Sequence, residues 1–517
     1  MCSLLSSVVM VAFTLRIVTL IQLDGYNAKL TDKIKQILSK QWFSAVAVGL
    51  YMYIIYLVSI LADMPSFQHF IALLTLLTCL YQTASISSID CRQQLVCTPR
   101  LVRWQSIYFV CLFVLFFIAY LAGSWITIGE VKLIYLFLPI CILLNWYILK
   151  LSLFIDYPIE KIVHNHYIKQ AKSKLQSMPN LVVIGVTGSC GKTSVKNYLT
   201  TILSPYYKVF CTPLNYNTPM GICKSVNMMA DDTQIFVVEM GARKLGDIQE
   251  LCDIVKPQYA ILTNICAQHL ESFGSIQNII DTKCEMLDYV ENKSNCIVGQ
   301  NDYMRDMQAK TKDCLIVGDD GFCTAKNIRC SASGSSFDMC IGKEKTTVCT
   351  SLIGKHNIFN ILLASACAYR LGLNMAQISS QIAQLKQVEH RLQVIENGGV
   401  TIIDDSYNSN VVGAKIAIDT LSMFDGEKIV MTQGVVELGK SQSSQNIELG
   451  EHIAGVADKC IVLGVNANDL WQGMLDGGMS RRDIFLVKNL EQGQQVLSQI
   501  VKNGSVVLIQ NDLTDNY

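Results

Sequence analysis

The feature that most constrains this chain is a glycine-rich segment between an apolar, β-rich run and a helical stretch. Residues 187–194 read Thr-Gly-Ser-Cys-Gly-Lys-Thr-Ser; the run Leu181–Val186 precedes them, and Val195–Leu203 has a helical pattern. A turn from strand to helix presents backbone N–H groups and a helix N-terminus to phosphate. Lys192 would reach the terminal phosphates of a nucleotide, and Thr193 would ligate Mg²⁺. The spacing departs from the standard G-x-x-x-x-G-K-S/T pattern, so a glycine-rich turn with a chance lysine is the alternative.

From about residue 180 onward, apolar β-rich stretches alternate with helix-like stretches, which is typical of an α/β fold with a mainly parallel sheet. A second alternation of the same kind begins near residue 400. We therefore expect a central ATP-binding domain at 179–388 and a smaller, Rossmann-like C-terminal domain at 389–517. The expected strands are Leu181–Val186, Ile235–Val238, Tyr259–Leu262, Cys296–Val298, Val400–Ile403, Lys428–Thr432, Lys459–Leu463 and Ser505–Ile509.

The region before residue 156 has a different composition. Apolar runs recur in it, each long enough for a ~30 Å hydrocarbon core, which takes about 20 helical residues. Long helices buried in a protein core are the alternative, but the runs contain almost no charge. We expect an α-helical transmembrane region at 1–155, with four or five spans, and a linker helix at 156–178. The runs are Leu4–Leu23, which carries Arg16 and is the doubtful span, Trp42–Ala62, His69–Ile86, Ser106–Ile126 and Leu133–Ile155.

Basic residues gather in every second connection between these runs. Segments 24–41 and 87–105 and the stretch after residue 155 are rich in lysine or arginine, whereas the intervening loops carry only Lys132. Basic loops stay in the cytoplasm. We therefore expect a multi-pass protein of the plasma membrane, with the lipid bilayer as a partner and the catalytic domains in the cytoplasm.

Charge and cysteine content exclude other classes of protein. The formal net charge is zero, so no global field attracts nucleic acid, and we expect no nucleic-acid partner. The chain has 20 cysteines but no C-x-x-C pair, which argues against a zinc ribbon and favours reduced thiols of a cytosolic protein. Cys190 lies in the glycine-rich segment, where a helix N-terminus could lower the pKa of its thiol, although exchange of one small residue for another explains it more simply.

Polar residues follow several of the expected strands. Glu239 ends one of them, and a carboxylate beside a phosphate loop can hold Mg²⁺. His269 follows another strand and implies a second metal position, although by itself it is more simply a loop histidine. Lys283 has the spacing of a solvated lysine on a helix. Further polar clusters occur later in the chain, at 354–360, 390–392, 404–410 and 434–439. The residues alone thus indicate a membrane-tethered Mg-nucleotide enzyme with two α/β domains.

Taken in order, these motifs resemble those of the Mur ligase family over roughly residues 155–517. Within that family they look most like the members that add D-alanyl-D-alanine to UDP-N-acetylmuramoyl-tripeptide. The motifs are Thr187–Ser194, Asn215–Ile222, Glu239–Ala242, His269–Phe273, Lys283–Glu285, Gly354–Asn360, Arg391–Leu392 and Asp405–Asn410.

The resemblance implies an ATP-dependent ligase that forms an amide bond. ATP would phosphorylate a carboxylate of a peptidoglycan precursor, UDP-linked or lipid-linked, to an acyl phosphate. An amino acid or a dipeptide such as D-Ala-D-Ala would then displace the phosphate. Mg²⁺ at two sites and Lys192 would neutralise the growing negative charge. A role in bacterial cell-wall synthesis would place the expected spans in the bacterial plasma membrane.

The resemblance also implies a role for each matching residue. The catalytic residues would be Lys192, His269, Lys283 and Arg391. The nucleotide would contact Gly188, Ser189, Gly191, Lys192, Thr193, Ser194, Asn357, Asn360, Arg391, Asp405 and Tyr407. The metal ligands would be Thr193, Glu239, His269 and a carbamylated Lys283, and the substrate would contact Asn217, Thr218, Asn408 and Asn410.

Two departures from the family pattern keep other functions open. The N-terminal domain that grips the uridine nucleotide in the family is replaced here by the apolar runs, and Val411 stands where the family has proline. A ligase that makes a poly-γ-glutamate-like polymer is one alternative. A silent membrane scaffold or a transport ATPase is another, but retention of Lys192, Glu239, His269 and Lys283 together argues against a scaffold. The spans also lack the polar path of a transporter.

Overall fold

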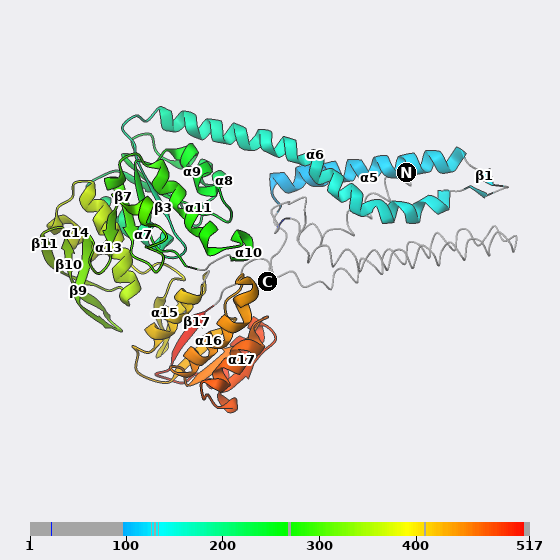
Figure 1. The fold of residues 1–517 in the computed structure, drawn as a ribbon. Coiled ribbons are helices and arrows are strands. Elements are labelled where there is room, and N and C mark those ends of the chain that lie inside the picture. The colour runs from blue at the N-terminus through cyan, green and yellow to red at the C-terminus, as the bar shows by residue number, and fades with distance from the viewer. Residues whose placement is uncertain are drawn as a thin grey trace. The chain divides into compact units, whose positions relative to one another are not determined.

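The computed structural model describes Gln22 and residues 97–510, except for residues 126, 129–130, 133, 267–269 and 408–409. The chain separates into two compact units that meet in the sequence at residues 165 and 166, and each unit is described by itself. The first unit contains α5 (Pro99–Trp125), the short strands β1 (Thr127–Ile128) and β2 (Val131–Lys132), and the first part of α6 (Ile134–Gln176) (Figure 1).

Helices α5 and α6 pack against each other through buried side chains. The indole nitrogen of Trp104 donates a hydrogen bond to Ser152 Oγ over 3.0 Å, and Arg103 Nε lies 2.9 Å from a carboxylate oxygen of Asp156. Several apolar side chains at helical spacing are also buried in this unit, namely Leu101, Tyr108, Leu112, Leu149 and Leu153. Part of the apolar surface of α5 and α6 therefore packs within the protein, whereas other apolar side chains of these helices, such as Phe117 and Phe154, are exposed.

This arrangement corrects the predictions about a membrane. Among the described residues, no helix is long and apolar enough to cross a bilayer. The predicted location in the bacterial plasma membrane, with multiple spans, is therefore wrong, and neither the transmembrane region nor a bilayer partner is supported. Two expected spans, 106–126 and 133–155, fall on α5 and α6, whose apolar side chains partly face other helices. The spans expected at 4–23, 42–62 and 69–86 lie outside the described residues.

Helix α6 also differs from the predicted helices in its length. It runs without a break from Ile134 to Gln176, so the helix expected as a separate linker at 156–178 is the second half of α6. That half is rich in polar and charged residues, and it carries the chain into the second unit, which begins at residue 166.

The second unit contains a central sheet of nine strands in the order β11-β10-β9-β8-β7-β6-β3-β5-β4. The neighbours from β4 to β9 in this order pair in parallel, whereas β9, β10 and β11 pair as antiparallel neighbours. The strands are β3 (Val182–Thr187), β4 (Val209–Cys211), β5 (Ile235–Glu239), β6 (Tyr259–Leu262), β7 (Cys296–Gly299), β8 (Leu315–Val317), β9 (Cys323–Ser331), β10 (Gly334–Ile341) and β11 (Glu344–Thr350). The predicted parallel sheet is confirmed.

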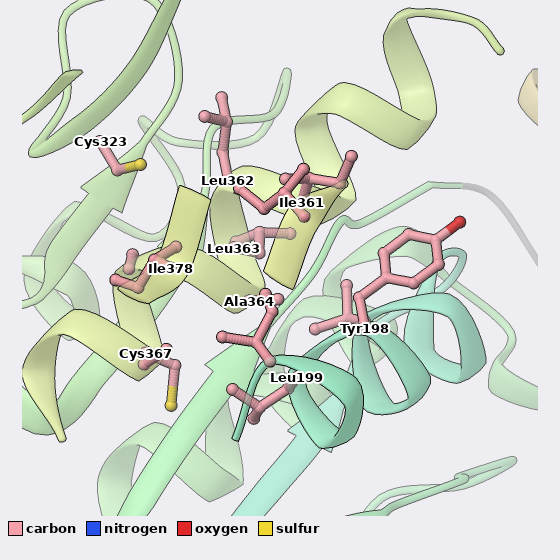
Figure 2. Packing of buried hydrophobic residues seen from close by; sticks show 14 of the residues in the cluster. Tyr198, Leu199, Cys323, Ile361, Leu362, Leu363, Ala364, Cys367 and Ile378 are labelled. Atoms are coloured by element: carbon pink, nitrogen blue, oxygen red, sulfur yellow. The ribbon is translucent and has the colours of Figure 1, made fainter. Parts of the chain in front are cut away.

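Helices cover both faces of this sheet, because its strands alternate buried side chains to each side. Ile184 and Ile235 belong to one hydrophobic cluster, whereas their neighbours Val183 and Phe236 belong to the other. The first cluster includes α7 (Lys192–Leu203), α13 (Lys355–Arg370) and α14 (Met375–Ile382); Figure 2 shows part of it. The second cluster includes α8 (Pro219–Met228), α9 (Asp247–Val255) and α11 (Ile276–Tyr289). Shorter helices are α10 (Leu270–Phe273), α12 (Gln308–Thr311) and the 3-10 turn η1 (Lys293–Asn295).

A second sheet has the strand order β12-β13-β17-β14-β15-β16, in which only β12 pairs as an antiparallel neighbour. Its strands are β12 (Gln393–Asn397), β13 (Val400–Asp405), β14 (Lys428–Thr432), β15 (Lys459–Val462), β16 (Ile484–Leu486) and β17 (Val506–Gln510). Helices α15 (Val411–Leu421), α16 (Gln442–Ala454) and α17 (Ala467–Asp476) pack on one face, and α18 (Leu490–Ile500) packs on the other. The turns η2 (Gly439–Ser441) and η3 (Arg481–Asp483) complete this part.

Candidate active site

The glycine-rich segment forms a tight turn between the end of β3 and the start of α7. Gly191 caps α7 with a φ of 82°, a left-handed conformation that favours glycine. A Cβ atom at Gly191 would lie 2.5 Å from Asn360 Oδ1, and one at Gly188 would lie 2.0 Å from Thr263 Oγ1. Both positions therefore require glycine, and the backbone of the loop is held closely by its neighbours.

Hydrogen bonds tie this loop to the chain that follows β6. Thr263 Oγ1 donates to the carbonyl of Cys190 over 2.5 Å, and the amide of Ser189 donates to the carbonyl of Asn264 over 2.7 Å. The hydroxyl of Ser189 also donates to the carbonyl of Cys266 and accepts from its amide, over 3.2 and 3.1 Å. Hydrogen bonds within the protein thus hold the loop in this conformation.

Lys192 folds back over the loop. Its ammonium donates to the carbonyls of Gly188 and Ser189 over 2.9 and 3.1 Å. Burial lowers the pKa of Lys192, and the charge of Glu239 opposes this shift. A phosphate in the loop would give this ammonium a stronger, charged acceptor than two carbonyl groups.

A buried carboxylate lies beside the loop, at the end of β5. Glu239 Oε2 accepts a hydrogen bond from Thr193 Oγ1 over 3.0 Å, and Oε1 accepts one from the side chain of Asn217 over 3.1 Å. Mg²⁺ is usually held by one or two carboxylates together with the phosphates of its nucleotide. Thr193 and Glu239 fit this donor set, and no group of three or more His, Cys, Asp or Glu side chains suited to a metal occurs among the described residues.

Lys196 is a residue of the site that the sequence analysis missed. Its side chain is 2% exposed, and its ammonium lies 3.3 Å from Glu239 Oε2. It also donates to the carbonyls of Thr212 and Leu214 over 2.8 and 3.0 Å. The sequence signal was its position one helical turn after Lys192, on the same buried face as Leu199. Lys196 therefore joins α7, Glu239 and the chain that leads to Asn217.

Lys283 lies on α11 with a side chain that is 4% exposed, whereas its spacing alone had indicated a solvated lysine. Burial lowers the pKa of Lys283 to about 7, and the charge of Lys192 adds to this shift. A large fraction of this amine is therefore neutral near pH 7, unlike an ordinary lysine. A neutral, buried amine is a better nucleophile than a solvated ammonium.

The second sheet contributes Arg391 and Tyr407 to the site. The Arg391 guanidinium lies 4.3 Å from the centre of the Tyr407 ring, a cation–π contact. His390 and Leu392, on either side of Arg391, have φ values of 58° and 50°, which are strained for residues with a side chain. Burial raises the pKa of Asp405 to about 7, although the charge of Arg391 opposes this shift. Strain of this kind is found at ligand-binding positions, where the surrounding structure maintains it.

These groups line one cavity of about 470 Å³. The predicted residues that line it are Gly188, Ser189, Gly191, Lys192, Thr193, Ser194, Asn217, Thr218, Glu239, Lys283, Arg391, Tyr407 and Asn410. The cavity is also lined by residues that were not predicted, among them Asn215, Arg243, Asp247 and Glu250. Asp247 had a usable signal, because an acidic residue in the first turn of a helix marks its N-terminus.

The remaining predicted residues lie elsewhere or outside the described part. Asn360 lies next to Gly191 of the loop, and Asn357 accepts a hydrogen bond over 2.7 Å from the hydroxyl of Tyr198 in α7. Neither residue lines the cavity. Asp405 adjoins Arg391 and does not line the cavity. His269 and Asn408, predicted to bind metal and substrate, lie outside the described residues.

Comparison with models of known protein families identifies both sheet-containing parts of the chain. The model for the Mur ligase middle domain matches residues 186–368, and the model for the Mur ligase glutamate ligase domain matches residues 390–510. Together the two ranges span more than half of the chain. The chain belongs to the Mur ligase family and is an ATP-dependent ligase that forms C–N bonds, as the sequence predicted.

Individual relatives give a finer comparison. The chain is similar to the UDP-N-acetylmuramoyl-tripeptide–D-alanyl-D-alanine ligases of Escherichia coli K12 (29% identity over 336 residues) and Bacillus subtilis 168 (28% over 288 residues). These matches cover 62% and 55% of this chain, and 73% and 62% of the relatives. Among solved structures, the MurF ligase from Thermotoga maritima in complex with ADP has a TM-score of 0.60 and 29% identity, covering 67% of this chain and 80% of that one.

The buried contact between Lys196 and Glu239 leads to a stability prediction. Replacing Lys196 by Met should lower the free energy of unfolding by about 3 kcal/mol, because Glu239 would remain buried without its cationic partner. Urea denaturation measures this difference. Lys208→Met is the matched control, since its pair with Asp232 is exposed and its loss should change the free energy of unfolding far less. Equal losses in the two variants would contradict the importance of the buried contact.

Proposed function

We propose that this chain joins D-alanyl-D-alanine to a carboxylate of UDP-N-acetylmuramoyl-tripeptide, at the expense of ATP. One observation carries the proposal: the phosphate loop, the Glu239 carboxylate and the Arg391–Tyr407 pair line the same cavity. The activity named for the relatives from Escherichia coli and Bacillus subtilis supports the choice of substrates. The UDP-linked acceptor is preferred over a lipid-linked one, because it is the acceptor in the names of these relatives.

The first chemical step would activate the acceptor. A carboxylate oxygen attacks the γ-phosphorus of ATP, a new P–O bond forms, and the bond to the leaving ADP oxygen breaks. The Lys192 ammonium would leave the carbonyls of Gly188 and Ser189 and neutralise the phosphate oxygens. Thr193 and Glu239 would hold Mg²⁺, which supplies further neutralisation of the β- and γ-phosphates when bound.

The second step would form the amide. The amine of the dipeptide attacks the acyl carbon, and the tetrahedral intermediate expels inorganic phosphate. The amine loses one proton in this step, so the net products are the amide, ADP, phosphate and a proton. Arg391 is a cation in the same cavity and would stabilise the negative charge that develops on the oxygens of the intermediate.

Lys283 would act as a carbamate in this proposal. Its neutral amine would attack carbon dioxide, an N–C bond would form, and a proton would leave, which converts a basic side chain into an anionic oxygen donor. The burial of Lys283 and its lowered pKa support this step. The carbamate would then contribute to a second Mg²⁺ position, together with His269 as in the family pattern.

A product assay tests the proposed function. The protein should release phosphate from Mg-ATP only when D-Ala-D-Ala and UDP-N-acetylmuramoyl-tripeptide are both present, and mass spectrometry should find the pentapeptide product. Lys192→Ala should lower turnover by at least about 100-fold, because the ammonium acts on charge that develops in the transition state. Turnover with a lone amino acid as amine donor, and none with the dipeptide, would reject the assignment.

A second prediction concerns the carbamate. Lys283→Ala should be nearly inactive, and short-chain carboxylates such as acetate should restore part of the activity, since they supply an anionic oxygen to the same space. Lys244→Ala is a control, because Lys244 belongs to the nearby 242–247 turn but does not line the cavity. Full activity of Lys283→Ala without added carboxylate would remove the carbamate from the mechanism.

A further inference from the structure

A cysteine of the phosphate loop lies in contact with a second cysteine from a distant part of the sequence. Cys190 belongs to the loop itself, and Cys266 belongs to the chain that follows β6. Their side chains share a hydrogen bond. The backbone around them is also joined, because Ser189 exchanges hydrogen bonds with the main chain of Cys266, and Asn264 Nδ2 lies 3.6 Å from Cys190 Sγ.

The two thiols differ in reactivity. The hydrogen bond from Cys266 lowers the pKa of Cys190 to about 7, and the nearby charge of Lys192 adds to this effect. The same contact raises the pKa of Cys266, which therefore keeps its proton. Cys190 lines the cavity, so small reagents can reach it, whereas Cys266 is buried. Reactive cysteines in proteins combine this thiolate character with access to solvent.

Most other buried cysteines of the described chain are less reactive than Cys190, because their thiols keep their protons. Burial raises the pKa of Cys252, Cys284, Cys323, Cys367 and Cys460, and none of them lines the cavity. A second thiol contact joins Cys296 and Cys314. Cys296 begins β7, however, and so lies at the end of the sheet opposite to the phosphate loop, which follows the carboxyl end of the parallel strand β3.

We propose that Cys190 and Cys266 form a peroxide-sensitive dithiol whose oxidation to a disulfide blocks nucleotide binding. The Cys190 thiolate attacks one oxygen of the peroxide, an S–O bond forms, and the O–O bond breaks with loss of hydroxide. The thiol of Cys266 then attacks the sulfur of this sulfenic acid, an S–S bond forms, and water leaves. The two thiols lose two electrons, and hydrogen peroxide is reduced to two molecules of water.

The packing of the loop explains why a disulfide would block the site. Gly188 and Gly191 already lie so close to Thr263 and Asn360 that neither position accepts a Cβ atom. The loop backbone on both sides of Cys190 is therefore closely held, and the approach of two sulfur atoms from hydrogen-bonding distance to a covalent bond of about 2 Å would strain it. The strain would fall on the backbone N–H groups that face the phosphates. This consequence rests on the proposed role of the loop in binding ATP.

The test uses the full-length protein, treated with hydrogen peroxide and then with iodoacetamide to block free thiols. Peptide mapping by mass spectrometry should find a peptide pair linked through Cys190 and Cys266. Binding of a fluorescent ATP analogue should weaken by about tenfold or more, and dithiothreitol should restore it. A saturating concentration of Mg-ATP during the treatment should protect Cys190 from both peroxide and iodoacetamide.

Cysteine variants test whether the response to peroxide comes from this pair or from another thiol. For each variant, ATP-analogue binding by the oxidised protein is compared with binding by the same variant in its reduced form. Cys190→Ser and Cys266→Ser should lose the reversible response, and Cys314→Ser, which removes the other thiol contact, should respond as the wild type does. Absence of the Cys190–Cys266 link in oxidised protein would overturn the proposal. So would a linked protein that still binds the ATP analogue normally. The link is detected by mass whether or not the chain uses D-Ala-D-Ala, so its absence is distinguishable from failure of the proposed function.

Discussion

The pairing of the buried Glu239 carboxylate is the interaction on which the site depends. Glu239 is 2% exposed, and an ionised carboxylate at that depth is costly unless its oxygens have partners. Thr193, Asn217 and Lys196 supply these partners from two different segments of the chain. The same contacts fix the start of α7 and the 212–218 segment relative to β5. One carboxylate, which we propose as a Mg²⁺ ligand, thus sets the geometry of the loops around it.

The sheet topology places that carboxylate beside the phosphate loop. Strand β3 lies between β5 and β6, so the segments that follow these three parallel strands meet at one edge of the sheet. The phosphate loop follows β3, Glu239 ends β5, and Thr263 to Cys266 follow β6. Ligand sites of open α/β sheets occur at this carboxyl edge. Arg391 and Tyr407 complete the cavity from the second sheet, where the strained backbone on both sides of Arg391 indicates a position fixed for a ligand.

Much of this architecture could be predicted from the sequence, because local patterns determine it. The strands Tyr259–Leu262 and Lys428–Thr432 have the predicted bounds, since each is a short, apolar run that is buried on both faces. The antiparallel strands β9 to β11 were missed, although Phe337, Met339 and Ile341 alternate with exposed or half-buried residues as a sheet requires. Their alternating pattern differs from the continuous apolar runs of the buried parallel strands.

The remaining errors concern facts that no local pattern contains. Lys283 has the spacing of a surface lysine, and only the tertiary structure buries it near Lys192. The spans expected at 106–126 and 133–155, which fall on α5 and α6, are unsupported for a related reason. An apolar helix such as α5 has the same composition whether its side chains face lipid or pack against other helices. Trp104 of α5, for example, is buried and donates a hydrogen bond to Ser152 of α6. Partners across the fold, and not the composition of a run, decide between these environments.

The central claim is that the cavity activates a carboxylate by transfer of the γ-phosphoryl group of ATP. The most direct measurement uses acceptor labelled with ¹⁸O in both oxygens of the reacting carboxylate, followed by mass analysis of the released phosphate. If an acyl phosphate forms, each phosphate carries one ¹⁸O atom and the amide product retains the other. Phosphate without ¹⁸O would contradict the account, because ATP would then be hydrolysed by water rather than spent on the carboxylate.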